Sequence, residues 1–421
     1  MKKFLSALLA AALLASSLPA LTLGVTAAGS VGLSFETNMD NTTCTVLGLG
    51  TCKDTDIVIP SKSPAGKTVT SVAGHAFSGS KKVTSVTFPN TVQKIGNGAF
   101  CSCENLTAVT IPQNLTQIGS MAFGNCDKLT AITVASGNTA FCAADGVLFN
   151  KSKTTLLCYP AGKQGAYTVP DTVTAIYEEA FYGCDKLTGI TFPSALKEIG
   201  NQAFSDCSGL KSVTLPESVV KFGLSVFRSC TGLEEVKLPS GMTRLPYAMF
   251  SCCSALKKVT LPILLTVVGE RTFFLCSSLT SFTLPDEVTE IGDDAFAQCT
   301  SLTSLTLPKG LLSVADGAFS DCTALSDVYY PGTQAEWEKI SVKDATLLKA
   351  KLHFGGVVRP AGDVDGNGDV DADDLTALAR HVGKIETFTD SAALAAADYN
   401  GDSAVTSDDL TALARKVAKI D

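Results

Sequence analysis

A phrase built around phenylalanine and cysteine returns at a fixed interval along most of the sequence. Except for one longer gap, neighbouring copies are twenty-three positions apart, and segments such as "AFSDCSGLKSVTLP" and "AFAQCTSLTSLTLP" show how closely they agree. Ten phenylalanines occupy the same position of the phrase: Phe77, Phe100, Phe123, Phe181, Phe204, Phe227, Phe250, Phe273, Phe296 and Phe319. A fixed period in this range predicts a solenoid, in which each repeat buries its apolar face against its neighbours. The chain is therefore expected to form an elongated rod.

Each repeat contains two short stretches with the pattern of a strand. In "LTAVTIP", apolar and small polar residues alternate up to a proline, which is typical of a half-buried strand, and "VQKIG" follows as a second strand. The segment "AFCSC" between such strands is too short for a long helix and is expected to be a turn at a corner. We therefore expect a mainly β solenoid with two strands per repeat and with rungs ~4.8 Å apart.

One interval between the phenylalanines is too long. Phe181 follows Phe123 by more than two repeat periods, and the surplus contains "DGVLFNKSKTTLLCYP", two strand-like runs around residues 150–153. This pattern predicts a hairpin inserted near residues 136–170 and projecting from the rod. A structural role for it is the simpler interpretation, and a binding role stays open.

Most of the fifteen cysteines follow the repeat. Nine occupy the third position after a repeat phenylalanine: Cys103, Cys126, Cys184, Cys207, Cys230, Cys253, Cys276, Cys299 and Cys322. We expect them to form an inward-facing ladder of small apolar fillers rather than catalytic or zinc-binding thiols. Local disulfides are plausible between Cys44 and Cys52 and between Cys142 and Cys158, whereas Cys101 and Cys252 have no obvious partner.

The two ends of the chain differ from the repeats. Lys2 and Lys3, an apolar run to residue 14 and Pro19 predict a secretory signal peptide over residues 1–28. The apolar run itself is too short to span a membrane. At the other end, residues 363–421 hold thirteen acidic and five basic side chains, so the whole net charge of −8 arises there. This distribution indicates one acidic module rather than an acidic surface, and it gives no sign of nucleic-acid binding or membrane insertion.

The acidic module contains two copies of a calcium-loop pattern. Residues 363–374, "DVDGNGDVDADD", and residues 398–409, "DYNGDSAVTSDD", place oxygen ligands at positions 1, 3, 5, 9 and 12 and offer the backbone carbonyl of position 7. The predicted ligands are Asp363, Asp365, Asn367, Asp369, Asp371 and Asp374 in the first copy and Asp398, Asn400, Asp402, Ala404, Thr406 and Asp409 in the second. Both copies end on Asp where Glu is usual, and Ser403 replaces the expected glycine. Because the pattern occurs twice, two calcium ions are preferred to the alternative of a solvated acidic tail.

An identical octet, "DDLTALAR", follows each loop. It places Leu375, Leu378 and Val382, and in the second copy Leu410, Leu413 and Val417, on one face of a helix.

Two families resemble these patterns. The phrasing "IGxxAFxxCxxLxxVxIPxxV" resembles the BspA-like bacterial leucine-rich repeats, which implies a solenoid over residues 68–355 with an N-terminal cap at 29–67. The segment "VYYPGTQAEWEKI" resembles the end of such arrays, where Trp337 would seal the last rung. After a short linker at 356–361, residues 362–421 with their two loop–helix copies resemble a type I dockerin.

The dockerin resemblance implies a docking function. Dockerins bind cohesin modules on the scaffoldins of cellulosomes, so the chain is expected to be secreted and cellulosome-associated at the cell surface. In the family, positions 10 and 11 of each loop and later helix positions select the partner. Carried over, these are Ala372, Asp373, Arg380, Lys384, Ser407, Asp408, Arg415 and Lys419. Only Ser407 matches the hydroxyl residues of the clostridial type, so another cohesin specificity group is expected, and binding in either of two orientations is a hypothesis.

We therefore predict a non-catalytic protein-binding component, with two alternatives. A glycoside hydrolase would need two carboxylates ~5 to 10 Å apart in a cleft, and no segment offers a separate catalytic domain. A polysaccharide-binding module would need exposed aromatic rings, yet the outward strand positions carry threonine, at Thr87, Thr110, Thr133, Thr191, Thr214, Thr260, Thr283 and Thr306. A charged patch interrupts this column with Glu234, Glu235, Lys237, Lys257 and Lys258. It is either a protein-contact site or a solvated face, and the ligand of the repeats stays unknown.

Overall fold

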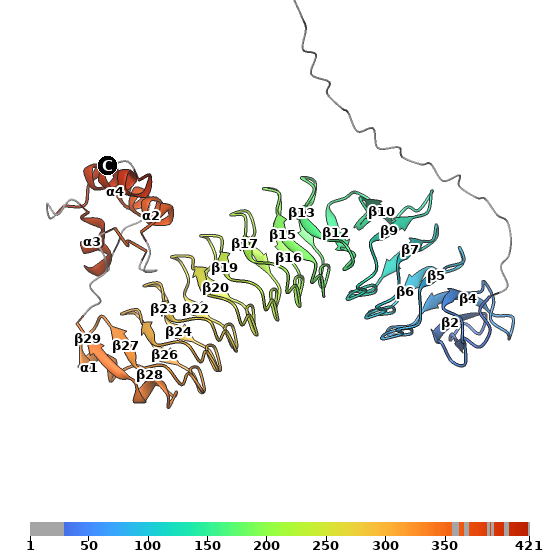
Figure 1. Cartoon of the computed structure of the whole chain (residues 1–421), viewed down its shortest axis with the longest axis horizontal. Helices are drawn as coiled ribbons and strands as arrows, with labels where there is room; N and C mark the ends of the chain where they lie inside the picture. Colours follow the sequence, from blue (N-terminus) through green and yellow to red (C-terminus); the bar gives the residue numbers. More distant parts are fainter. Residues whose placement is uncertain are drawn as a thin grey trace, which may run out of the picture.

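The repeats form a curved rod in the computed structural model, which describes residues 29–355, 362–365, 370–384, 388, 391–399 and 404–419 (Figure 1). The predicted signal peptide and linker lie outside this part of the chain. Successive rungs pair in parallel with a shift of one repeat, as in Val236 with Val259 and Ile291 with Val314. This register confirms the solenoid predicted from the period.

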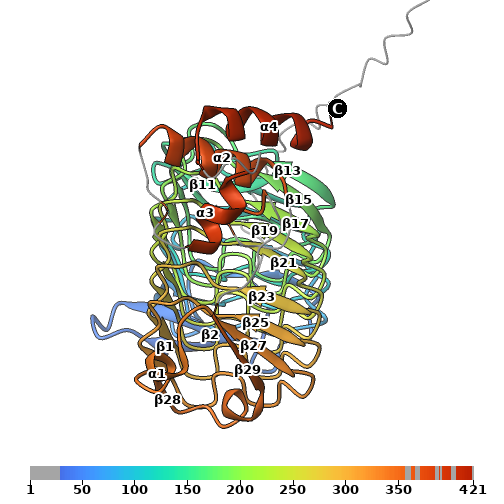
Figure 2. The ribbon, with the colours of Figure 1, turned by 90° about the vertical axis from the view of Figure 1, so that its left-hand side faces the viewer.

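One face of the rod carries one strand from each rung, and in most rungs a proline follows that strand closely. Figure 2 looks along the rod and shows most of these strands stacked behind one another. They are β3 (Asp56–Val58), β5 (Ser85–Thr87), β7 (Ala108–Ile111), β9 (Ala131–Val134), β13 (Gly165–Thr168), β15 (Leu187–Thr191), β17 (Ser212–Thr214), β19 (Glu235–Lys237), β21 (Lys258–Thr260), β23 (Ser281–Thr283), β25 (Ser304–Thr306), β27 (Asp327–Tyr330) and β29 (Lys351–Phe354). We call this surface the threonine face, because its outward positions are mostly threonine; Thr110 and Thr133 share a hydrogen bond of 2.9 Å.

A second set of short strands forms another face. It comprises β4 (Thr68–Val72), β6 (Lys94–Ile95), β8 (Gln117–Ile118), β14 (Ala175–Ile176), β16 (Glu198–Ile199), β18 (Lys221–Phe222), β20 (Arg244–Leu245), β22 (Val267–Val268), β24 (Glu290–Ile291), β26 (Ser313–Val314) and β28 (Ser341–Val342). At the N-terminal end, β1 (Ser34–Thr37) and β2 (Thr43–Gly48) form an antiparallel hairpin, and β2 pairs with β4. This hairpin covers the edge that would otherwise be open to other chains.

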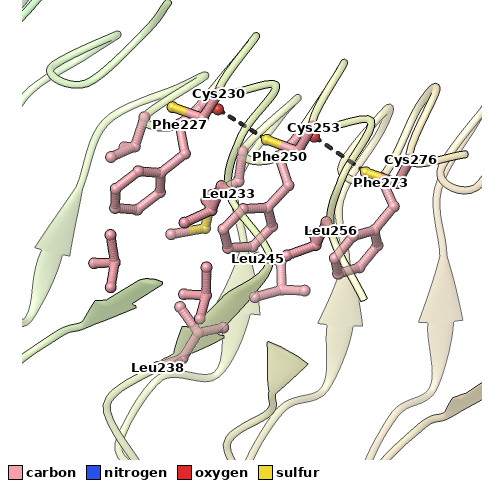
Figure 3. Packing of buried hydrophobic residues seen from close by; sticks show 14 of the residues in the cluster. Phe227, Cys230, Leu233, Leu238, Leu245, Phe250, Cys253, Leu256, Phe273 and Cys276 are labelled. Atoms are coloured by element: carbon pink, nitrogen blue, oxygen red, sulfur yellow. Dashed lines mark hydrogen bonds between the residues drawn. The ribbon is translucent and has the colours of Figure 1, made fainter. Parts of the chain in front are cut away.

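The repeat phenylalanines and cysteines form two ladders inside the rod (Figure 3). All ten phenylalanines are at most 1% exposed, and neighbouring rings such as Phe227, Phe250 and Phe273 stack at 5.8 and 5.5 Å. The nine ladder cysteines are buried as predicted. Each of Cys253 and Cys276 donates its thiol to the carbonyl of a phenylalanine in the preceding rung, at 3.0 and 3.2 Å. Burial raises the pKa of the Cys253 thiol, as expected for an inert filler.

The extra segment between Phe123 and Phe181 differs from the expectation. The hairpin is present as the antiparallel strands β11 (Val147–Asn150) and β12 (Thr155–Cys158), with β10 (Phe141–Ala144) beside β11. It does not project, because Phe149 and Leu156 are fully buried and β12 pairs with β14 of the next rung. Tyr159 stacks on Phe181 at 5.0 Å, so a tyrosine takes the ladder position in a rung of its own.

The two expected disulfides are absent, and all fifteen cysteines are free. Cys142 lies in β10 and Cys158 in β12, with β11 between them. Two strand spacings separate their backbones by about 9 to 10 Å, which exceeds the ~7 Å that a disulfide can bridge. Cys44 is buried in β2, where its thiol donates to the carbonyl oxygen of Lys67 at 3.6 Å.

The C-terminal end of the rod is closed by a short helix and a last rung. Helix α1 (Gln334–Trp337) begins with a capping box between Thr333 and Glu336. Trp337 is 6% exposed and packs against Tyr330 with ring centroids 5.5 Å apart, as expected for a seal. The 3₁₀ turn η1 (Leu347–Lys349) leads into β29.

Beyond the rod lies a small helical unit with its own core. It contains α2 (Ala372–Val382), α3 (Ser391–Ala397) and α4 (Ser407–Val417). Leu378 and Leu413, which belong to the predicted helix faces, are fully buried together with Val364 and Ala397. The described part contains no helix of the length and apolarity needed to cross a membrane.

Candidate functional site

Three carboxylates of the first acidic loop meet at one point of the helical unit. One oxygen from each of Asp363, Asp365 and Asp374 lies within 4.8 Å of the others. Asp363 and Asp374 are 2% and 0% exposed, whereas Asp365 is half-buried. The loop therefore brings its first, third and twelfth positions together, as the sequence pattern predicted.

Backbone hydrogen bonds fix the position of Asp374. Its Oδ1 accepts from the N–H groups of Val364 and Asp365 at 2.7 and 3.1 Å, and its Oδ2 accepts from the N–H of Asp371 at 2.8 Å. The Asp371 side chain accepts from the N–H of Asp373, which completes a capping box at the start of α2. Desolvation by burial raises the pKa of the Asp374 carboxyl above its usual range.

The geometry of this cluster fits a calcium ion. Oxygens that ligate one Ca²⁺ at ~2.3 to 2.6 Å lie no more than about 5 Å apart, and the three carboxylate oxygens meet that limit. Burying several carboxylates together is costly unless a cation or hydrogen bonds compensate for it. These three residues could therefore hold a divalent cation.

The remaining predicted ligands are placed differently. Asp371 caps α2 and forms an ion pair with Lys258, 3.4 Å away. In the second copy, Asp409 is fully buried and accepts from the N–H of Thr406 at 2.8 Å, so the capping box is repeated there. Asp398 and Ala404 lie within the described residues, but Asn367, Asp369, Asn400 and Asp402 lie outside them.

The helical unit touches the threonine face of the rod. The Lys237 ammonium, in β19, forms an ion pair with the Asp373 carboxylate, and Lys258, in β21, pairs with Asp371. Lys257 and Glu234, which also belong to the predicted patch, form an exposed pair at 2.9 Å. The sequence predicts this charged patch but not its contact with the helical unit. The only sequence signal of that contact is Lys237, which interrupts a column of threonines.

Comparison with known families agrees with this architecture. The family model described as "BspA type Leucine rich repeat region (6 copies)" matches residues 51–152, 158–280 and 247–352. Together these segments cover more than half of the chain. The chain belongs to the BspA-type leucine-rich repeat family. A second model, "Dockerin type I domain", matches residues 361–418, so the helical unit is a type I dockerin domain.

One solved structure agrees with the solenoid fold. A leucine-rich repeat protein from Eubacterium ventriosum is 25% identical and aligns with a TM-score of 0.53 over 69% of this chain and 93% of its own. Another from Bacteroides ovatus is 22% identical with a TM-score of 0.43, covering 77% and 98% of the two chains. No curated protein matched the chain.

Both families narrow the range of functions. Leucine-rich repeats and dockerins are non-catalytic, and no catalytic domain is found in this chain. Type I dockerins bind calcium, and their presence indicates a cohesin partner. Proteins of both families are typically extracellular or on the cell surface.

The partner residues predicted from the dockerin resemblance belong to the two copies of the loop–helix pattern. We call them the first face, with Ala372, Asp373, Arg380 and Lys384, and the second face, with Ser407, Asp408, Arg415 and Lys419. Ala372 and Lys384 are exposed in the first face, whereas Asp373 and Arg380 are half-buried. All four residues of the second face are exposed.

Proposed function

We propose that the protein is a non-catalytic, secreted component of a cellulosome. Its dockerin binds a cohesin module of a scaffoldin in a calcium-dependent manner, and its solenoid binds another protein. The observation that carries the proposal is the convergence of Asp363, Asp365 and Asp374 at the start of α2. A buried carboxylate cluster at that point couples cation binding to the position of the helix that carries the partner residues.

Each loop would hold one calcium ion. In the first copy, Asp363, Asp365, Asn367, Asp371, Asp374 and the backbone carbonyl of Asp369 would supply the ligands. In the second copy, these would be Asp398, Asn400, Asp402, Thr406, Asp409 and the backbone carbonyl of Ala404. The bound ion supplies positive charge that compensates for the crowded carboxylates. The chain itself holds Asp374 in place with three backbone N–H groups and orients α2 through the capping box.

The solenoid offers a regular face whose outward positions are mostly threonine rather than the aromatic rings on which sugars stack. Tyr329 of β27, which lies next to Thr306 in the same column and stacks on His353 with ring centroids 4.6 Å apart, is an aromatic ring on this face. A rigid rod with a regular polar face and scattered charges suits a protein ligand, whose identity the repeats do not encode. Polysaccharide binding is the alternative, and pull-down on cellulose or xylan tests it directly.

Cohesin binding tests the central claim. Calorimetric titration of the full chain with a panel of purified type I cohesins should detect at least one complex in calcium and none in chelator. The variant Asp363→Asn/Asp374→Asn should lose that complex, whereas Asp321→Asn, which removes an acid from a turn of the solenoid, should retain it. Equal affinity in calcium and in chelator would rule out the calcium dependence, and no complex with any cohesin would rule out the docking function.

A further inference from the structure

The dockerin lies against the solenoid through its first face. Figure 1 shows the dockerin beside the C-terminal half of the rod, and the ion pairs place the start of α2 at β19 and β21. The contact joins parts of the chain that are far apart in sequence, in the ion pairs Lys237 with Asp373 and Lys258 with Asp371. The Asp373 side chain is only 24% exposed in this contact.

A cavity of about 300 Å³ lies beside these ion pairs and is lined by both parts of the chain. Leu238, Leu261 and Pro262 contribute apolar surface from the solenoid, and Thr376, Ala377 and Arg380 line it from α2. The turns that follow β19 and β21 therefore lie opposite the side of α2 that carries Asp373 and Arg380 of the first face.

The two copies of the octet provide an internal comparison. Since "DDLTALAR" is identical in α2 and α4, differences in exposure cannot come from the helix sequence. Asp373 and Arg380 are half-buried, but their equivalents Asp408 and Arg415 are exposed. Ala377 is buried, and its equivalent Ala412 is only half-buried. The three positions that differ in this way all line the cavity at the solenoid.

Charge favours the same arrangement. The dockerin carries the entire net charge of the chain, and Asp371 and Asp373 stand at the start of α2. Facing them, β19 and β21 are neighbouring parallel strands, and Lys237 and Lys258 project from the same side of that sheet. Opposite charges on the two surfaces attract each other and steer the surfaces together.

We propose that the threonine face at Lys237 and Lys258 holds the first face of the dockerin, so that a cohesin is bound through the second face. A symmetric dockerin can bind a cohesin in two orientations, and the solenoid would leave only one of them available. The inference rests on the proposed function for the identity of the partner. We call the covering of the first face by the solenoid the masking. It is a property of this chain and can be measured without a cohesin.

Arginine modification measures the masking directly. In the calcium-loaded full chain, a dicarbonyl reagent followed by peptide mass spectrometry should modify Arg415 several-fold faster than Arg380. In the variant Lys237→Glu/Lys258→Glu, the two rates should converge, because repulsion from Asp371 and Asp373 releases the first face. The variant Lys81→Glu/Lys94→Glu, with the same charge change on rungs near the N-terminal end of the rod, should keep the difference. Equal rates in the wild-type chain would overturn the masking.

Cohesin titration then tests which face binds. In the full chain, Asp408→Ala/Arg415→Ala should weaken binding at least tenfold, which is about 1.4 kcal/mol. Adding Lys237→Glu/Lys258→Glu to that variant should restore the affinity to within a few-fold of wild type, because the first face then becomes available. Retained binding by the second-face variant alone, or no recovery when the lysines are reversed, would refute the assignment.

The two experiments separate the two claims. If no cohesin binds the wild-type chain in calcium while Arg380 is still protected, the proposed partner is wrong and the intramolecular contact stands. If a cohesin binds in calcium and Arg380 is as reactive as Arg415, the docking function stands and the masking is wrong.

Discussion

Replacing one ring of the phenylalanine ladder should destabilise the rod more than most single substitutions. Phe250 is fully buried and stacks between Phe227, at 5.8 Å and an interplanar angle of 4°, and Phe273, at 5.5 Å and 13°. A buried Phe→Ala change costs about 3 to 5 kcal/mol through lost burial and the cavity it leaves. Since two stacked contacts are lost, each worth about 0.5 to 1.5 kcal/mol beyond its area, Phe250→Ala should lie near the upper end of that range.

Urea unfolding followed by circular dichroism would measure this loss. Phe354→Ala, at a ring that is 38% exposed in the last strand, is a matched control and should cost clearly less. Because rungs contact only their neighbours, the variant could also split the single transition into two, with a smaller urea dependence for each. A loss below about 2 kcal/mol, or one no larger than that of the control, would show that the ladder does not stabilise the rod in the way its geometry indicates.

Three further results are expected. Calcium should raise the melting temperature of the dockerin, and Asp374→Asn should reduce that increase; an unchanged response would contradict its role as a ligand. Burial raises the pKa of the Cys103 thiol to about 11, so its contribution to stability is complete below about pH 9 and is lost as the pH rises towards 11; Cys103→Ala should flatten that part of the profile. In native protein, iodoacetamide should label Cys142 and Cys252, which are partly exposed, before any ladder cysteine, and disulfide-linked peptides would contradict the free thiols.

The sequence predicts the repeating part of the fold well because one period specifies many positions at once. The third position after each repeat phenylalanine has the same environment in every rung, so the burial of Cys230 and Cys299 follows from a single pattern. The same logic predicts the helix faces of the dockerin, where Leu378 and Leu413 are both buried. The convergence of Asp363, Asp365 and Asp374 follows from loop spacing, although the structure describes only part of each loop.

The failures occur where the period is broken or where distant parts meet. Tyr159 fills a ladder position that falls just short of a full period before Phe181, so a search for phenylalanine at the fixed interval missed that rung. Alternation alone cannot separate a projecting hairpin from strands of the core, so the prediction of a projecting hairpin is wrong for the strand that buries Phe149. Contacts such as Lys237 with Asp373 depend on how two folded parts pack together, and no local pattern encodes them.

Docking and stability should be separable in this architecture. Inward and outward side chains alternate along each strand, so Val236 packs in the core and Val259 against it, while Lys237 and Lys258 project from the threonine face. Changing the lysines leaves both ladders intact, and ion pairs at a surface, such as these partly exposed ones, contribute only about 0 to 1 kcal/mol to stability. Lys237→Glu/Lys258→Glu should therefore keep the urea midpoint of the wild-type solenoid while releasing the dockerin. A large fall in that midpoint would mean that the dockerin contact is part of the fold and not a separate docking surface.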